Sequence, residues 1–199
     1  MVKKRLELKD IMTVGIFVVI YYVAFFAAMC VGYFPPAMPF LTIISGLLCG
    51  IPFILFLTKV KKPGCILLYG IVCGLISLAM GSGVMPLIFA AAVSAVCEVL
   101  MFCFKYKASI KYILVYMIFT LWNIGYGIRL YLSTSSAYVD SLNEGYGEDY
   151  VSSMLDYVTG VTFWCSVGLC LLGGLLGGLL GYAVFRKHFK KIEMSTGTN

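Results

Sequence analysis

The sequence contains little charge. Asp, Glu, Lys and Arg make up only 12% of its 199 residues, whereas 61% of the residues are hydrophobic and the mean hydropathy is +0.98. No water-soluble domain of this size needs so large an apolar share. Nearly uncharged stretches recur from one end to the other, and an apolar helix of about 20 residues crosses a hydrocarbon core of roughly 30 Å. The composition therefore predicts a polytopic membrane protein.

Catalytic and metal-binding patterns are missing as well. The sequence has no HExxH, no GxSxG and no phosphate-binding loop, and its only histidine, His188, lies in a basic tail. The 8 cysteines form no CxxC and lie in or beside apolar runs, where free cysteine packs as a small hydrophobe. We therefore expect no enzyme, no metal site and no cofactor. The net charge of +6 does not indicate nucleic-acid binding, because the basic residues lie in short clusters between apolar runs.

Six apolar runs are present. They predict an all-α bundle of six transmembrane helices that forms a single domain over residues 1–199. The runs lie at about 11–33, 38–58, 64–81, 85–104, 111–132 and 158–185.

The basic residues predict the orientation of this bundle. Of the 15 Lys and Arg, all but Arg129 lie before the first run, after the second, after the fourth or after the sixth. With six spans these four regions face the same side, and basic loops face the cytoplasm. Both termini are therefore predicted to be cytoplasmic, and the protein is expected in the lipid bilayer of the cell membrane.

Arg129 is the basic residue that this pattern does not explain. It lies near the outer end of the fifth run, and a helical wheel places it on one face with Trp122 and Tyr126, with Asn123 further round. A guanidinium, two aromatic rings and an amide suit a small ligand with an anionic group. These four residues are the candidate substrate-binding site. Pairing with the acidic loop above it, or snorkelling to the headgroups, would also explain Arg129.

A long loop at 133–157 follows on the predicted outer side. It holds Asp140, Glu144, Glu148, Asp149 and Asp156 but no Lys or Arg. Within it, Val151, Met154, Leu155 and Val158 are spaced as on one face of a short amphipathic helix. The loop is predicted to be either a lid over a site or a solvated acidic segment.

Glycine in the last run predicts close helix packing. In LLGGLLGGLLG, Gly173, Gly177 and Gly181 are four residues apart, as are Gly174 and Gly178. Small residues at this spacing let helix backbones approach each other closely.

Glu98 is the second ionisable residue inside an apolar run. It shares a helix face with Ala91, Ser94 and Ala95, in the inner half of the fourth span. The face is expected to pack on another helix, with Glu98 reaching a cytoplasmic lysine. A proton-relay role is the alternative.

Three stretches together resemble one known family. They are LKDIMTVGIFVVIYY in the first run, GIPFILFLTKVKKPG at the end of the second, and RKHFKK after the sixth. With six spans in about 200 residues, the chain resembles the Trep_Strep family of bacterial integral membrane proteins over nearly its whole length.

The resemblance implies a role in nutrient uptake, because that family is placed among the substrate-binding S components of energy-coupling factor (ECF) transporters. Such a subunit captures a trace nutrient from outside, and an ECF coupling membrane protein with two cytoplasmic ATPases drives its release. Its first helix contacts the coupling protein through small residues four apart. Ala24 and Ala28 have this spacing, and Gly15 lies nearer the cytoplasmic end.

Three functions therefore remain open. The chain is a substrate-capture subunit of an importer, an autonomous small secondary transporter or channel in which Glu98 is essential, or a membrane accessory protein without a ligand.

Overall fold

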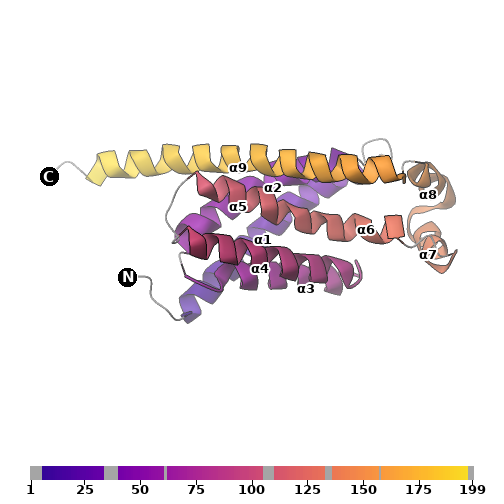
Figure 1. Cartoon of the computed structure of the whole chain (residues 1–199), viewed down its shortest axis with the longest axis horizontal. Coiled ribbons are helices and arrows are strands. Elements are labelled where there is room, and N and C mark those ends of the chain that lie inside the picture. The colour runs from indigo at the N-terminus through magenta and orange to yellow at the C-terminus, as the bar shows by residue number, and fades with distance from the viewer. Residues whose placement is uncertain are drawn as a thin grey trace.

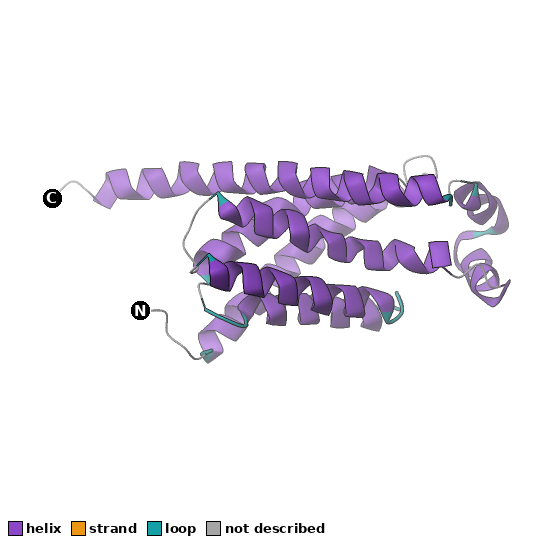
Figure 2. Cartoon of the chain, in the orientation of Figure 1, coloured by secondary structure: helices purple, strands orange, loops and turns teal. Residues whose placement is uncertain are grey.

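The computed structural model describes residues 6–33, 40–60, 62–104, 110–132, 136–156 and 158–196, and every regular element in these ranges is a helix (Figures 1 and 2). The longer helices share one axis. α1 begins and α9 ends at one end of it, here the terminal end, and α7 and α8 lie at the other, the distal end (Figure 1). The elements are α1 (Leu8–Met29), η1 (Cys30–Tyr33), α2 (Leu41–Lys59), α3 (Cys65–Ala79), α4 (Met85–Cys103), α5 (Lys111–Phe119), η3 (Thr120–Asn123), α6 (Ile124–Leu132), α7 (Ser136–Tyr146), α8 (Glu148–Leu155) and α9 (Gly160–Thr196).

Within the described ranges, four helices are long and apolar enough to cross a membrane. They are α1, α2, α4 and the part of α9 over Gly160–Lys187. The apolar helix α3 has 15 residues, which corresponds to about 22 Å. The all-helical membrane architecture predicted from the sequence is thus confirmed in its coarse form.

The fifth apolar run differs from the single helix that the sequence suggested. It consists of α5, the 3-10 segment η3 and α6, which follow one another in the same direction (Figure 1). In η3 the hydroxyl of Thr120 donates to the Met117 carbonyl at 2.7 Å and contacts the Cys170 carbonyl of α9 at 3.2 Å. Hydroxyls that bond nearby carbonyls in this way bend or tighten a helix. The helical wheel drawn through this run therefore does not apply across η3.

Glycine brings α9 and α2 into backbone contact. A Cβ added at Gly173 would lie 2.7 Å from the Cα of Ile43, and one added at Gly46 would lie 2.7 Å from the Gly173 carbonyl carbon. One turn on, Gly50 and Gly177 approach each other in the same way. We call this row of contacts between α2 and α9 the glycine seam. No side chain larger than hydrogen fits within it.

A second glycine row on α9 faces a different helix. A Cβ at Gly174 would lie 2.8 Å from the Cα of Met117, and one at Gly178 would lie 3.0 Å from the Cγ2 of Ile113, both on α5. The two rows recognised in the sequence therefore serve two neighbours of α9. The phenol of Tyr116 joins these neighbours by donating to the Gly46 carbonyl at 2.6 Å.

Aromatic side chains fill the space enclosed by α1, α2, α3 and α5. The rings of Phe53 and Phe119 stack with centroids 4.2 Å apart, and the ring of Tyr69 meets that of Phe53 edge-on at 5.3 Å. Tyr21 of α1 contacts both Tyr69 and Phe119. All four are fully buried. Such edge and offset contacts stabilise aromatic cores beyond the area that they bury.

The acidic segment after α6 is largely helical. The amphipathic helix predicted from its apolar spacing is present as α8, in which Val151 and Met154 are buried, although the helix ends at Leu155 and Val158 lies beyond it. Gly147, with φ of 87°, makes the turn between α7 and α8. This backbone conformation favours glycine, because a Cβ would be strained there.

Candidate ligand-binding site

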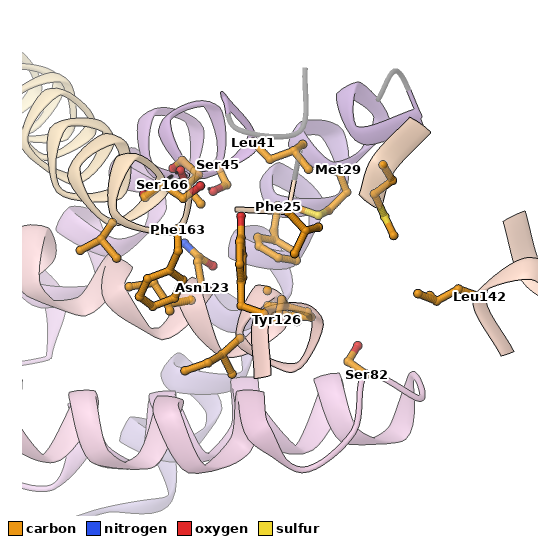
Figure 3. Close-up of a pocket in the computed structure, with 18 of the residues that line it drawn as sticks. Phe25, Met29, Leu41, Ser45, Ser82, Asn123, Tyr126, Leu142, Phe163 and Ser166 are labelled. Carbon is orange, nitrogen blue, oxygen red and sulfur yellow. Dashed lines mark hydrogen bonds between the residues drawn. The ribbon is translucent and has the colours of Figure 1, made fainter. Parts of the chain in front are cut away.

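A cavity of about 570 Å³ lies at the distal end of the bundle (Figure 3). Helices far apart in the sequence meet around it, and α7 and α8 contribute to its wall. The lining consists of Phe25, Phe26 and Met29 of α1, Leu41, Thr42 and Ser45 of α2, Met80 and Ser82 of the α3–α4 turn, Asn123, Ile124, Tyr126, Gly127, Ile128 and Tyr131 of η3 and α6, Leu142, Tyr146, Tyr150 and Met154 of α7 and α8, Val158, and Phe163, Ser166 and Val167 of α9.

The described wall of this cavity is aromatic and uncharged. Among the lining residues that the structure describes there are seven Phe and Tyr side chains and no Asp, Glu, Lys, Arg or His. The rings of Phe25 and Tyr126 are 5.4 Å apart, and those of Tyr146 and Tyr150 stack at 5.4 Å across the turn between α7 and α8. Concave sites with apolar walls and few polar groups are typical of small-molecule binding.

Asn123 is the polar residue in this wall that needs explanation. It is only 7% exposed, and neither its amide nitrogen nor its amide oxygen has a hydrogen-bond partner among the described residues. A buried amide without partners costs roughly 1–3 kcal/mol of stability. Asn123 thus keeps a hydrogen-bond donor and an acceptor that no described residue uses.

A second polar region of the wall lies between α2 and α9. The hydroxyl of Thr42 donates to the Ser166 carbonyl at 3.2 Å, and that of Ser45 donates to the Thr42 carbonyl at 3.1 Å. Ser45 and Ser166 appear together in Figure 3. These hydroxyls keep lone pairs that can accept hydrogen bonds from a molecule in the cavity.

Tyr126 connects the cavity with the interior. Its ring lines the wall, while its hydroxyl bonds to Ser77, which in turn bonds to Tyr22. Tyr22 also donates to the Cys73 carbonyl. This series of hydrogen bonds fixes the position of the Tyr126 ring, because the Tyr126 hydroxyl is already paired with Ser77.

The structure separates the four residues predicted to hold substrate. Asn123 and Tyr126 line the cavity, whereas Trp122 is fully buried and its indole nitrogen donates to the Tyr21 hydroxyl at 2.9 Å. Trp122 is therefore part of the core beside the cavity. Arg129 belongs to α6, and its side chain lies outside the described part, so its contact with a ligand stays a prediction.

Sequence reasoning missed the contributions of α1, α2 and α9 to the wall. Phe25, Ser45 and Phe163 lie in apolar runs and carry no local signal of binding. They become wall residues only because their helices converge at the distal end. The sequence left open whether the acidic loop is a lid or a solvated segment. Two of its residues, Tyr146 and Met154, line the cavity.

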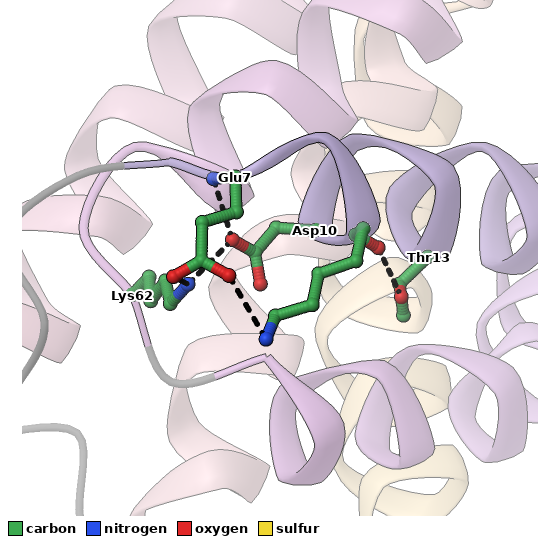
Figure 4. A network of polar contacts seen from close by, with 5 residues as sticks. Glu7, Asp10, Thr13 and Lys62 are labelled. Carbon is green, nitrogen blue, oxygen red and sulfur yellow. Dashed lines mark hydrogen bonds and ion pairs between the residues drawn. The ribbon is translucent and has the colours of Figure 1, made fainter.

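A network of charged side chains joins the start of α1 to the connection between α2 and α3 (Figure 4). Lys62 contacts Asp10 at 2.7 Å and Glu7 at 3.1 Å, and the Glu7 amide donates to the Asp10 carboxylate at 2.8 Å. The hydrogen bond from Lys62 to Asp10 raises the pKa of Lys62. These contacts fix the start of α1 to the connection between α2 and α3, and they lie apart from the cavity.

Glu98 also acts at a helix end. Its Oε2 accepts the backbone N–H groups of Ile66 and Leu67 at 3.0 and 3.2 Å, at the first turn of α3. The packing role expected for Glu98 thus has a defined partner. The sequence predicted that Glu98 reaches a cytoplasmic lysine, and the two lysines that follow α4, Lys105 and Lys107, lie outside the described residues.

The helices and the cavity can now be compared with known proteins. A model of the Trep_Strep family, described as a hypothetical bacterial integral membrane protein, matches residues 8–191. The chain belongs to the Trep_Strep family. The match includes every residue of the cavity wall and nearly all of α9. No curated protein and no solved structure matches the chain.

The candidate coupling residues of this Trep_Strep protein lie on two faces of α1. Ala28 is fully buried and Ala24 packs against the core, whereas Gly15 is exposed and a Cβ added there would meet nothing within 4 Å. The exposed face around Gly15 is apolar and comprises Ile11, Met12, Ile16, Val19, Ile20 and Val23. The structure therefore leaves Gly15, and not the alanine pair, accessible to a partner helix.

Proposed function

We propose that this Trep_Strep protein is the substrate-capture subunit, or S component, of an ECF-type nutrient importer. The observation that carries the proposal is the cavity of about 570 Å³ with Asn123 in its wall, whose amide has no hydrogen-bond partner among the described residues. A protein that served only as a structural accessory would gain nothing from a buried amide without partners. A capture subunit needs a lined site of this kind and no ATP-binding motif of its own.

The proposed topology has six membrane passes with both termini in the cytoplasm. The basic clusters in the sequence support it. With this orientation the distal end faces outside, so the cavity opens to the compartment from which a nutrient comes. α7 and α8 then form a cover over the cavity, because Leu142, Tyr146 and Met154 all line it.

The proposed partners are an ECF coupling membrane protein and two cytoplasmic ATPases. The exposed face of α1 around Gly15 supports a helix contact, since glycine allows a partner backbone to approach closely. A proton-coupled carrier centred on Glu98 has less support, because Glu98 is not a cavity residue and its carboxylate caps α3.

A pull-down of the tagged protein, solubilised mildly from its native membrane, tests this function. We expect the wild-type protein to recover one further membrane protein and two ATPases. Gly15→Trp should reduce that recovery about tenfold or more, because the indole fills the contact face. The matched control is Gly168→Trp on α9, since Gly168 is also exposed and a Cβ there meets nothing within 4 Å.

Two results would contradict the proposal at different levels. Recovery of the wild-type protein without any ATPase would exclude the importer role. Equal recovery by Gly15→Trp and Gly168→Trp would keep the role but move the contact away from Gly15.

A further inference from the structure

The carboxamide of Asn123 offers two complementary groups side by side. Its NH₂ group donates and its carbonyl accepts, and the two point in nearly the same direction. Both atoms are covered from solvent and have no partner among the described residues. A single molecule that satisfies both must therefore carry an acceptor next to a donor.

The backbone around Asn123 is held firmly. On one side, Trp122 is fixed by its hydrogen bond to Tyr21. On the other, Gly125 lies so close to α4 that an added Cβ would be 2.8 Å from the Cα of Pro86. A functional group held on both sides in this way is preorganised, which reduces the entropy lost when a ligand binds.

The rest of the cavity defines what kind of molecule can carry these groups. The described part of the wall contains aromatic rings such as Phe25 and Phe163 and no charged side chain, so a charge placed against it would lose its hydration without gaining a counter-ion from these residues. Flat rings pack well against such walls. A volume of about 570 Å³ accommodates a fused ring system.

We propose that the buried part of the ligand is an uncharged, planar ring system whose edge carries a hydrogen-bond donor beside an acceptor, as in a lactam, and that this edge pairs with the Asn123 carboxamide. The inference rests on the proposed function, because it names the class of molecule captured in that site. Binding turns aside the side chains that cover the amide. An anionic substituent, if the ligand has one, extends from the cavity toward Arg129 and is not buried at Asn123.

Three probes with one ring system test the inference. They are 2-quinolinone, which has the lactam edge, 1-methyl-2-quinolinone, in which the donor is blocked, and quinoline-2-carboxylate, which is an anion. Their dissociation constants are measured on the purified full chain in lipid nanodiscs. We expect the lactam to bind about tenfold more tightly than its methylated form, and the carboxylate to bind more weakly than the lactam.

Variants assign the preference to Asn123. In Asn123→Leu the affinity ratio between the first two probes should fall to about one. In Gly168→Ala, an exposed position outside the cavity wall, it should stay at about ten. The unfolding temperature of empty Asn123→Leu should not fall, since the substitution removes two unpaired buried atoms. If Asn123→Leu fails to fold, Asn123→Ala replaces it in the same comparison.

Several outcomes would overturn the inference. Equal wild-type affinities for lactam and methylated lactam would do so, as would an unchanged ratio in both Asn123 variants or tighter binding of the carboxylate. If no probe binds, the small molecules that co-purify with the wild-type protein are identified by mass spectrometry. An uncharged fused ring with an amide edge supports the inference, and an anionic or non-aromatic molecule overturns it while leaving the capture function intact. Absence of any bound molecule overturns both.

Discussion

The helix pair α2 and α9 forms two different regions, a glycine contact and part of a cavity wall. At Gly46 and Gly173, α2 and α9 approach until their backbones touch, whereas Ser45, next to Gly46, and Ser166, seven residues before Gly173, line a cavity. In a membrane, apolar side chains gain little by leaving lipid for protein, so close backbone packing becomes a main source of helix association. The glycine seam supplies this packing, and the distal end does without it.

The two regions differ in which side chains the sequence places between the helices. Small residues at a spacing of four close the seam and exclude side chains. Around the cavity, bulky aromatics and hydroxyls take their place, and the short helices α7 and α8 complete the wall. We expect damage to the seam to affect the whole fold and damage at the distal end to stay local.

The largest effect should come from the seam itself. Gly177→Leu places a side chain where even a Cβ would collide with the Gly46 carbonyl, so α2 and α9 must separate. Overpacking typically costs about 1–3 kcal/mol, and it costs more where the backbone cannot move. We expect loss of monodisperse protein on size exclusion in detergent and a large drop in unfolding temperature.

Gly168→Leu is the matched control, because Gly168 is exposed on the same helix and has nothing within 4 Å of an added Cβ. It should leave yield and unfolding temperature unchanged. Wild-type behaviour of Gly177→Leu would show that the seam is not required, and the contrast between the two ends would then fail.

A smaller effect is expected at the first turn of α3, in the terminal half. Gly64, the residue before α3, has φ of 90° and no side chain to cap the helix, and Glu98 supplies the cap from α4. Glu98→Ala leaves the amides of Ile66 and Leu67 unpaired, which should cost about 2 kcal/mol of unfolding free energy. Thermal unfolding and hydrogen exchange of those amides measure it.

Glu98→Gln separates hydrogen bonding from charge, because glutamine keeps an acceptor oxygen of similar reach. It should lose less stability than Glu98→Ala. An unfolding temperature of Glu98→Ala equal to that of the wild type would contradict the capping role.

These residues also show what the sequence can and cannot predict. The apolar runs and the glycine spacing are local patterns, so the helical class and the close approach of α9 follow from them. The partner of Glu98 could not be foreseen, because the α3 amides that it caps are 31 and 32 residues away. Similarly, the sequence placed Trp122 in the candidate site. Its indole N–H instead donates to the hydroxyl of Tyr21, which is 101 residues away.

The cavity followed from sequence only in part. Asn123 and Tyr126 were placed in the candidate site because both lie toward the outer end of one apolar run. The helical wheel failed at η3, where Thr120 bonds to α9 as well as to its own helix. The walls from α1 and α2 depend on how whole helices converge, and no local pattern encodes that.

The smallest of the effects should be confined to the distal end. Gly147 has φ of 87° and ψ of 149° in the turn between α7 and α8, a backbone region essentially restricted to glycine, and alanine is strained there by about 1–3 kcal/mol. Gly147→Ala should therefore speed amide hydrogen exchange in α7 and α8 and leave exchange in the seam residues of α9 unchanged. Gly145→Ala, within α7 and with open space around an added Cβ, should slow exchange in α7, because alanine favours helix more than glycine does. Opposite signs for two glycines only two residues apart would locate the effect in the turn. Faster exchange in α9 as well would show that the distal helices are coupled to the seam and that the two regions do not act separately.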